Sequence, residues 1–415
     1  MDGLDVLHVE VCQKMDSSLA AHETENLAYA EISALEEVAL EVPIIDFYNE
    51  KAKTHIDSIT CSCSYSERSH MKTQGATLKF HVYRLTAENA AIETMENDSE
   101  DLAAYSHWVL PSKEFYQLWE NLYFNSSTKQ DLLHFVETTM IFSEHNVNPN
   151  IISCNKVIFL YGPPGTGKTS MCQALAQKIS IRLSERYTHG ELVEINSNSL
   201  FSKWFSESGK LVMKLFDEIR RHLQNPKALV CILINEIESL AHMRKTCTNG
   251  SEPTDAIRVV NALLTQLDQI KHYPNVVIMT TSNLTEAIDL AFVDRADVKQ
   301  YIGHPNEEAI YKIYTSCLKE LMRAKLMEQE TIYDLSYLKQ SGYNETNETA
   351  NSIKLMELSR NSVGLSGRTL RKIPFLAHAL HLRSKKCTLS RFLRAMYLAV
   401  QANTIKTNVQ KSATI

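Results

Sequence analysis

The sequence has no apolar stretch long enough to cross a membrane. Its longest fully apolar run, Ala228–Ile234, has seven residues, whereas a membrane-spanning helix needs about 20. The segment Met1–Ala20 is acidic and lacks a basic region followed by an apolar one, so we expect neither a secretory signal nor a membrane partner. The nine cysteines are scattered along the chain, which favours a reduced intracellular compartment over a disulfide framework.

The chain also lacks tandem repeats and the basic motifs typical of DNA-directed motors. Its net charge of −6 conceals an asymmetry: residues 1–100 hold 19 acidic and 7 basic residues, and the remainder holds 30 acidic and 36 basic. An acidic N-terminal part favours a protein partner over nucleic acid. A length of 415 residues with 44% hydrophobic and 22% charged residues indicates a globular protein of two or three domains.

The most specific motif is a phosphate loop of the form G-x-x-x-x-G-K-[ST], which begins at Gly162. An apolar run, Val157–Leu160, precedes the loop and predicts a buried strand, and helical spacing follows it. Lys168 is expected to reach the β- and γ-phosphates of ATP, and the Thr169 hydroxyl to ligate Mg²⁺. The residues predicted to bind ATP are Gly162, Pro163, Pro164, Gly165, Thr166, Gly167, Lys168, Thr169 and Ser170.

A second polar site is predicted where the apolar strand Ala228–Glu236 ends. Glu236 is placed to orient the attacking water or to take its proton. Phosphate-loop ATPases usually hold Mg²⁺ through an aspartate at the preceding position, and here that residue is Asn235. We therefore expect weaker Mg²⁺ affinity and slower turnover but retained nucleotide binding. Asn283 ends the next buried strand and is expected to position water against the γ-phosphate.

Strands that alternate with helices predict an α/β doubly wound core with a parallel sheet. We predict three domains, at residues 1–105, 106–304 and 305–415, and the last is mainly helical. Strands are expected at Val6–Val11 and Thr77–Leu85, and partial helix over Leu19–Val42. The acidic stretch Ala91–Asp101 is interpreted as a linker. Phe115–Leu122 and Lys129–Phe142 are predicted to be amphipathic helices.

Two features leave alternatives open. Cys61 and Cys63 form a C-S-C pair that hints at zinc, but no second ligand pair stands at a suitable spacing. Trp108 precedes the ATPase core and is suited either to stacking on adenine or to ordinary interdomain packing.

Two further positions are equally open. Trp204 and Phe205 are adjacent, so at least one is expected to be exposed unless both are buried together. Arg368 lies near the start of a predicted helix, where it is suited to pairing with the γ-phosphate or to surface solvation.

Six stretches together resemble the AAA+ ATPases, and one branch in particular, the pachytene checkpoint protein family, also called thyroid hormone receptor interactor thirteen. The resemblance covers essentially the whole chain and is strongest from Ser106 onward. Besides the phosphate loop, the stretches are S-H-W-V-L-P at Ser106, S-L-F-S-K-W-F-S-E-S-G-K at Ser199, D-A-I-R-V-V-N-A at Asp255, A-F-V-D-R-A-D-V-K-Q-Y-I-G at Ala291 and G-L-S-G-R-T-L-R-K-I-P-F-L-A-H-A at Gly364.

The resemblance implies an AAA+ core with a C-terminal helical lid and a small α+β N-terminal domain. It implies a homohexamer that uses ATP and Mg²⁺ to convert HORMA-domain proteins from a closed to an open state, with a HORMA-like adaptor. The implied settings are meiotic recombination and chromosome-axis control, the synaptonemal complex and the spindle assembly checkpoint. The implied location is the nucleus and chromosomes, with a cytoplasmic pool.

The resemblance also assigns roles to individual residues. It makes Lys203, Trp204 and Phe205 the pore loop that grips the client. Asn283 and Arg368 become the first and second sensors of nucleotide, and Arg295 becomes the arginine finger that enters the neighbouring subunit's site. A hypothesis of a different class is an ATP-gated, hydrolysis-deficient binding ring, because Asn235 departs from the usual aspartate.

Overall fold

The computed structural model describes residues 6–63, 69–95, 102–124, 127–197, 208–239, 254–283, 290–382 and 386–413. Contacts divide the chain into two compact units. The first unit holds Met1–Glu120, Ser127–Gly162 and Lys168–Tyr301, and the second holds Asn121–Ser126, Pro163–Gly167 and Ile302–Ile415. Within the described ranges, no helix has both the length and the apolar character needed to span a bilayer.

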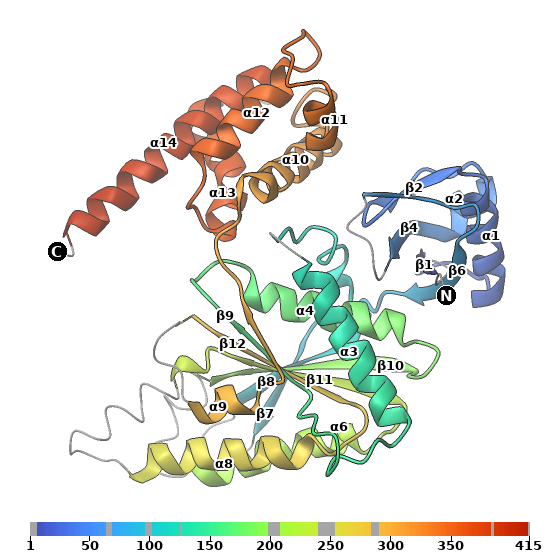
Figure 1. Cartoon of the computed structure of the whole chain (residues 1–415), viewed down its shortest axis with the longest axis vertical. Helices are drawn as coiled ribbons and strands as arrows, with labels where there is room; N and C mark the ends of the chain where they lie inside the picture. Colours follow the sequence, from blue (N-terminus) through green and yellow to red (C-terminus); the bar gives the residue numbers. More distant parts are fainter. Residues whose placement is uncertain are drawn as a thin grey trace. The chain divides into compact units, whose positions relative to one another are not determined.

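The first unit contains a seven-stranded sheet with the order β13-β9-β12-β11-β10-β8-β7 (Figure 1). The strands from β13 to β10 pair in parallel, and β8 and β7 continue the sheet with antiparallel pairs. The bounds are β7 (Ala91–Met95), β8 (Leu102–Leu110), β9 (Val157–Tyr161), β10 (His189–Asn196), β11 (Ala228–Asn235), β12 (Val276–Ser282) and β13 (Val298–Tyr301).

The apolar strand runs of the sequence are explained by helices on both faces of this sheet (Figure 1). Alternate residues of β11, including Val230 and Ile232, are buried against α6 (Ser208–Leu223) and α8 (Thr254–Ile270). Since side chains alternate across a strand, the intervening residues face α4 (Lys168–Arg182). Two further helices of this unit are α3 (Thr128–Glu144) and α9 (Leu290–Arg295).

The N-terminal part of the first unit is an α+β domain around a four-stranded sheet, in the order β3-β4-β1-β6. The central strand β1 pairs antiparallel with β4 and parallel with β6, and Cys61 and Cys63 of β4 are buried in its apolar core. The other elements pack around this sheet. The bounds are β1 (Val6–Gln13), α1 (Ala21–Ser33), β2 (Glu37–Ala39), β3 (Pro43–Ile44), α2 (Glu50–His55), β4 (Ile56–Cys63), β5 (His70–Lys72) and β6 (Thr77–Arg84).

Several local predictions were wrong. The expected linker Ala91–Asp101 contains β7. Of the helix predicted at Phe115–Leu122, only the short 3₁₀ helix η1 (Lys113–Phe115) forms, and turns follow it. The predicted boundary at residue 105 falls within β8, and the three-domain division stays a prediction.

Buried ion pairs connect the N-terminal domain to α4, the helix that follows the phosphate loop. Glu10 of β1 accepts hydrogen bonds from Lys178 Nζ at 2.6 Å and from Arg182 Nε at 2.7 Å. All three side chains are at most 3% exposed. Burial alone would raise the pKa of Glu10, but the two cations lower it to about 2. An ionised carboxylate therefore fixes the C-terminal end of α4 to β1.

The second unit is a helical lid built around a shared apolar core. In α13, Pro374 lies inside the helix, and a π-helical turn η2 (His378–Leu382) follows it directly. The helix α11 was not predicted from the sequence. The bounds are α10 (Glu307–Arg323), α11 (Leu335–Gln340), α12 (Ala350–Asn361), α13 (Gly367–Ala377) and α14 (Leu389–Ala413).

Candidate nucleotide-binding site

The phosphate loop connects the end of β9 to the start of α4, as the sequence predicted. Gly162, Gly165 and Gly167 have φ values of 145°, 76° and 99°, which only glycine adopts without strain. Such a glycine-rich loop can turn its backbone N–H groups inward around a phosphate, and the N-terminus of the helix that follows adds a favourable partial positive charge. Within the loop, the Thr166 hydroxyl donates to the carbonyl oxygen of Pro163 at 2.9 Å.

The loop segment Pro163–Gly167 groups with the helical lid. The backbone N–H of Arg368, in the first turn of α13, donates to the carbonyl oxygen of Gly165 at 3.0 Å. A Cβ atom at Gly165 would lie 3.0 Å from the Ser366 hydroxyl, so a side chain at this position would force the loop and α13 apart. The structure thus places the backbone of the predicted second sensor against the loop, and the Arg368 side chain is exposed.

Lys168 and Thr169 occupy the first turn of α4. Lys168 is buried, and its ammonium donates to the carbonyl oxygen of Gly162 at 2.8 Å, which holds the cation at the mouth of the loop. The Thr169 hydroxyl donates to Asn235 Oδ1 at 3.1 Å. The two residues predicted to hold Mg²⁺ therefore meet directly, although they stand 66 positions apart in the chain.

Two further side chains hold Asn235, and neither was predicted from the sequence. Its Oδ1 also accepts a hydrogen bond from the Thr281 hydroxyl at 2.9 Å, and its Nδ2 donates to Glu194 Oε1 at 2.6 Å. Glu194 accepts a second bond from Gln173 at 2.9 Å. Burial raises the pKa of Glu194, and the donors Gln173 and Asn235 oppose that rise. The only sequence signal for Glu194 is a carboxylate inside an apolar strand.

Glu236 follows β11 in a left-handed backbone conformation, with φ of 58°. For a residue with a Cβ atom, this conformation costs about 1–2 kcal/mol. Its carbonyl oxygen accepts from the Ser197 hydroxyl at 2.7 Å, and its N–H donates to Thr281 Oγ1 at 3.3 Å. The surrounding hydrogen bonds therefore hold a strained backbone where the predicted catalytic base leaves the strand.

Asn283 comes directly after β12. Ser282 pairs in register with Tyr161, and Thr280 pairs with Ile234. Since parallel strands end at one edge of a sheet, Asn283 lies at the same edge as the start of the phosphate loop and Asn235.

Arg295 lies elsewhere in the first unit. Its guanidinium donates to both carboxylate oxygens of Asp268, the shortest contact being 2.7 Å. Both residues line a small hollow with Val157, the first residue of β9, whereas the phosphate loop follows the last residue of that strand. Burial would raise the pKa of Asp268, and Arg295 instead lowers it. The structure does not bring Arg295 together with Lys168, Thr169, Asn235 and Glu236.

The remaining sequence hypotheses concern Trp108, the cysteine pair and the predicted pore loop. Trp108 is buried, donates to Glu114 at 2.8 Å and contacts the ring of Phe115. These packing contacts account for the position of its side chain. Cys61 and Cys63 belong to no metal-ligand group among the described residues. Lys203, Trp204 and Phe205 lie outside the described residues.

The sheet, the phosphate loop and the helical lid together define an ATPase of the AAA+ class. The AAA family model matches residues 158–304. Two more specific models match on either side: the TRIP13 N-terminal domain at residues 3–88 and the TRIP13-like AAA+ ATPase lid C-terminal domain at residues 306–404. The chain belongs to the TRIP13 family, whose curated members are named pachytene checkpoint protein 2 homologues.

Individual relatives are similar along almost the whole chain. The pachytene checkpoint protein 2 homologue of Gallus gallus is 48% identical over 398 residues, which is 95% of this chain and 92% of the relative. The Homo sapiens homologue is 47% identical over 399 residues, with the same shares covered. The solved structure of C. elegans PCH-2 superimposes with a TM-score of 0.79 and 31% identity, and covers 97% of this chain and 100% of that one.

Proposed function

We propose that this chain hydrolyses ATP to convert HORMA-domain proteins from a closed to an open state, as a homohexamer that works with a HORMA-like adaptor. The observation that carries the proposal is the family match of all three parts, the N-terminal domain, the AAA domain and the lid. A remodeller needs each of them: a domain that docks the client, a motor, and a lid that responds to nucleotide.

The residues at the strand edge support hydrolysis. A water oxygen attacks the γ-phosphorus, the bond to the bridging oxygen breaks, and ADP leaves with that electron pair. Glu236 takes the proton of the water, and Lys168 stabilises the charge on the phosphates. Mg²⁺, when bound, offsets phosphate charge, and the hydroxyl of Thr169 and Oδ1 of Asn235 are hard oxygen donors suited to it or to its water ligands.

The placement of Arg295 supports assembly. Its guanidinium lies by the first residue of β9, whereas the phosphate loop follows the last residue of that strand. It is thus better placed to serve a neighbouring subunit than its own nucleotide. An arginine that enters the next site stabilises charge on the transferred phosphoryl group, so hydrolysis would require the ring.

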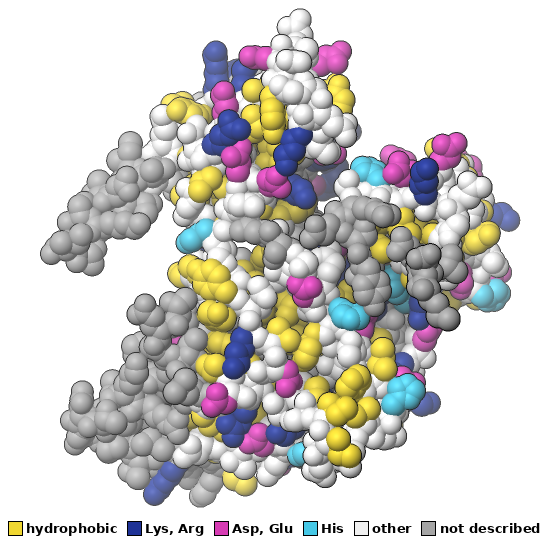
Figure 2. All heavy atoms as spheres, viewed as in Figure 1, with side chains coloured by type: hydrophobic (Ala, Val, Ile, Leu, Met, Phe, Trp, Pro, Cys, Tyr) yellow, Lys and Arg dark blue, Asp and Glu magenta, His cyan; other side chains and the backbone are white. Residues whose placement is uncertain are grey.

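Charge distribution supports protein partners over nucleic acid. On the face seen in Figure 2, acidic and basic side chains are interspersed, and residues 1–100 are strongly acidic. By the family resemblance we place the protein in the nucleus and on chromosomes, including the synaptonemal complex, with a cytoplasmic pool. Its proposed settings are meiotic recombination, chromosome-axis control and the spindle assembly checkpoint.

A second candidate function is an ATP-gated ring that binds HORMA proteins without turnover. Asn235 favours it, because the usual aspartate would place a negative charge beside the magnesium ion. The hydrogen bond from Asn235 to the half-buried Glu194 weakens this alternative, since a carboxylate remains next to the amide.

Steady-state ATP hydrolysis by the purified protein, with and without a HORMA client and adaptor, separates the two functions. We expect client-stimulated turnover that falls at least about 100-fold in Glu236→Gln, which removes the base. Glu218→Gln, at a partly exposed glutamate on α6 that pairs with Arg221, serves as the matched control and should hydrolyse like the wild type. Release of a peptide from the closed client reports remodelling directly. If the wild type binds ATP but turns over no faster than Glu236→Gln, the remodelling function is excluded and the ring that binds without turnover remains.

A further inference from the structure

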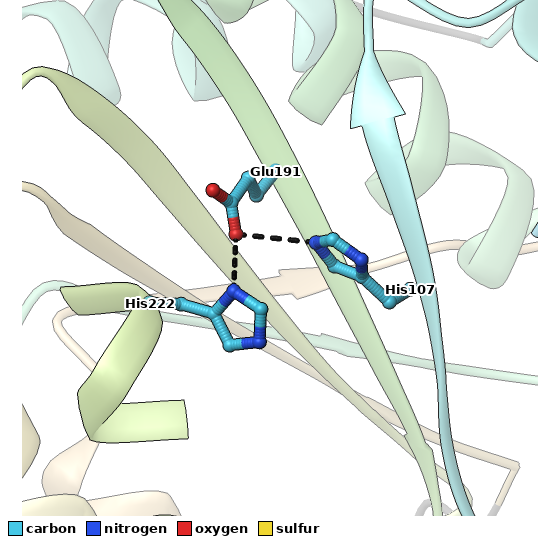
Figure 3. Close-up of side chains that lie close together, drawn as sticks. All are labelled: His107, Glu191 and His222. Atoms are coloured by element: carbon cyan, nitrogen blue, oxygen red, sulfur yellow. Dashed lines mark hydrogen bonds and ion pairs between the residues drawn. The ribbon is translucent and has the colours of Figure 1, made fainter. Parts of the chain in front are cut away.

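Two histidines and a glutamate from three different elements meet on the face of the sheet covered by α6 (Figure 3). Glu191 lies on β10, and His107 lies on β8 opposite Val193. Because side chains two positions apart share a face, His107 and Glu191 point the same way. His222 comes from the last turn of α6. This cluster is independent of the nucleotide site, since Glu194 lies three positions along β10 and faces the other side of the sheet.

The three ligand atoms converge on one point. His222 Nδ1 lies 2.6 Å from Glu191 Oε2, and His107 Nε2 lies 3.1 Å from the same oxygen. All three ligand atoms are within 4.8 Å of one another, and the two imidazole rings are tilted with centroids 4.7 Å apart. In a tetrahedral site with bonds of about 2.1 Å, neighbouring ligand atoms are about 3.4 Å apart. Small outward rotations of these side chains would therefore make room for an ion.

Outer partners hold the ligands in this orientation. His189 Nε2 contacts the second oxygen of Glu191, Oε1, at 3.1 Å, and its Nδ1 contacts the Thr188 hydroxyl at 3.0 Å. The Tyr105 hydroxyl lies 3.5 Å from His222 Nε2, the ring nitrogen that does not face the glutamate. Metal-binding histidines and carboxylates commonly have such hydrogen-bonded supports, which fix the ring orientation.

Burial and access also suit a metal site. The Glu191 side chain is 10% exposed, so its charge needs compensation. His107 and His222 are 14% and 25% exposed, which leaves an entry path and room for a water ligand. Two nitrogen donors and one oxygen donor favour zinc and its neighbours over Mg²⁺.

We propose that His107, Glu191 and His222 bind one divalent transition-metal ion, zinc in the first instance, with water in the fourth position. The ion would join the adjacent strands β8 and β10 to the last turn of α6. Since α6 begins at Ser208, shortly after the predicted pore-loop residues, the site would anchor the far end of the helix that follows that loop.

The test is metal binding by the full-length protein, measured by calorimetry with Zn²⁺ and by the visible absorption of Co²⁺. We expect one ion per chain, with a tetrahedral cobalt spectrum that lacks thiolate charge transfer, because the ligands are nitrogen and oxygen. The wild-type spectrum alone tests the proposal, so the test does not depend on the folding of any variant.

Variants then assign the ligands. His107→Gln/His222→Gln should weaken Zn²⁺ affinity at least 100-fold, and His189→Gln, which removes a support, about 10-fold. His272→Gln, an exposed histidine after α8, is the matched control and should bind like the wild type. A thiolate spectrum, no binding by the wild type, or equal affinity in a folded double variant would overturn the proposal.

Discussion

At the scale of single residues, Asn235 combines two properties that the sequence did not reveal together. It presents Oδ1 to Thr169, the predicted magnesium ligand, and it donates Nδ2 to the carboxylate of Glu194. An aspartate cannot make the second bond, because it has no N–H to donate. The departure from the usual aspartate therefore fits its surroundings, since it gives the half-buried Glu194 a hydrogen-bond donor.

Restoring the aspartate should consequently destabilise the nucleotide-free protein. We expect Asn235→Asp to lose about 1–3 kcal/mol of unfolding free energy, because a new buried carboxylate would face that of the half-buried Glu194. Adding Glu194→Gln should recover most of this loss, since glutamine can donate to the new aspartate. Urea denaturation of the two single variants and the double variant forms a complete cycle. Strictly additive effects would contradict the direct coupling of these residues.

Glu236 offers a second test at this scale, because its φ of 58° is unfavourable for any residue with a Cβ atom. We expect Glu236→Gly to be about 1 kcal/mol more stable than Glu236→Ala, since both lose the side chain and only glycine relieves the strain. At ordinary positions glycine is the less stable of the two. Thermal unfolding of both variants provides the comparison, and an equal or more stable alanine variant would show that the strain is not significant. Both variants should lack hydrolysis.

At the scale of elements, the strands and helices around the phosphate loop were predictable because periodicity and motif agree there. The predictions for β9, α4, β11 and β12 were confirmed within a few residues. The strands β7 and β8 were missed, because an acidic stretch and a short motif show no strand periodicity by themselves. Their order comes from antiparallel pairing of β8 with β10 and of β7 with β8. The partners Glu194 and Glu191 were missed for a related reason: their contacts come from distant parts of the chain.

The junction between β1 and α4 predicts how stability depends on pH. The pKa of Glu10 falls from its ordinary value of 4.5 to about 2, since Lys178 and Arg182 outweigh its burial. A carboxylate with a lowered pKa stabilises the fold above its unfolded pKa, and the contribution is lost as pH falls from 4.5 toward 2. Its size is about 3 kcal/mol.

We therefore expect Glu10→Gln to be less stable than the wild type by about 3 kcal/mol near pH 7, and the difference should shrink as pH falls below 4.5. Urea denaturation at a series of pH values measures it. Glu25→Gln, an exposed glutamate on α1, is the control and should follow the wild type throughout. A difference that stays constant with pH would mean that Glu10 acts through packing and not through its charge.

At the scale of the whole molecule, variants of Arg295 test whether each active site is shared between neighbouring subunits of a ring or is complete within one chain. Arg295→Ala keeps the nucleotide-binding residues but lacks the finger, and Lys168→Ala keeps the finger but cannot hold the phosphates. Each variant alone should be inactive. Mixed in equal amounts before assembly, they should recover roughly a quarter of the wild-type hydrolysis, because random order places an intact site beside an intact finger in about one interface of four.

Hydrolysis by the mixture is the measurement, and light scattering checks that mixed rings form. An inactive mixture of assembled rings, or a fully active Arg295→Ala ring, would exclude Arg295 as a residue supplied by the neighbouring subunit.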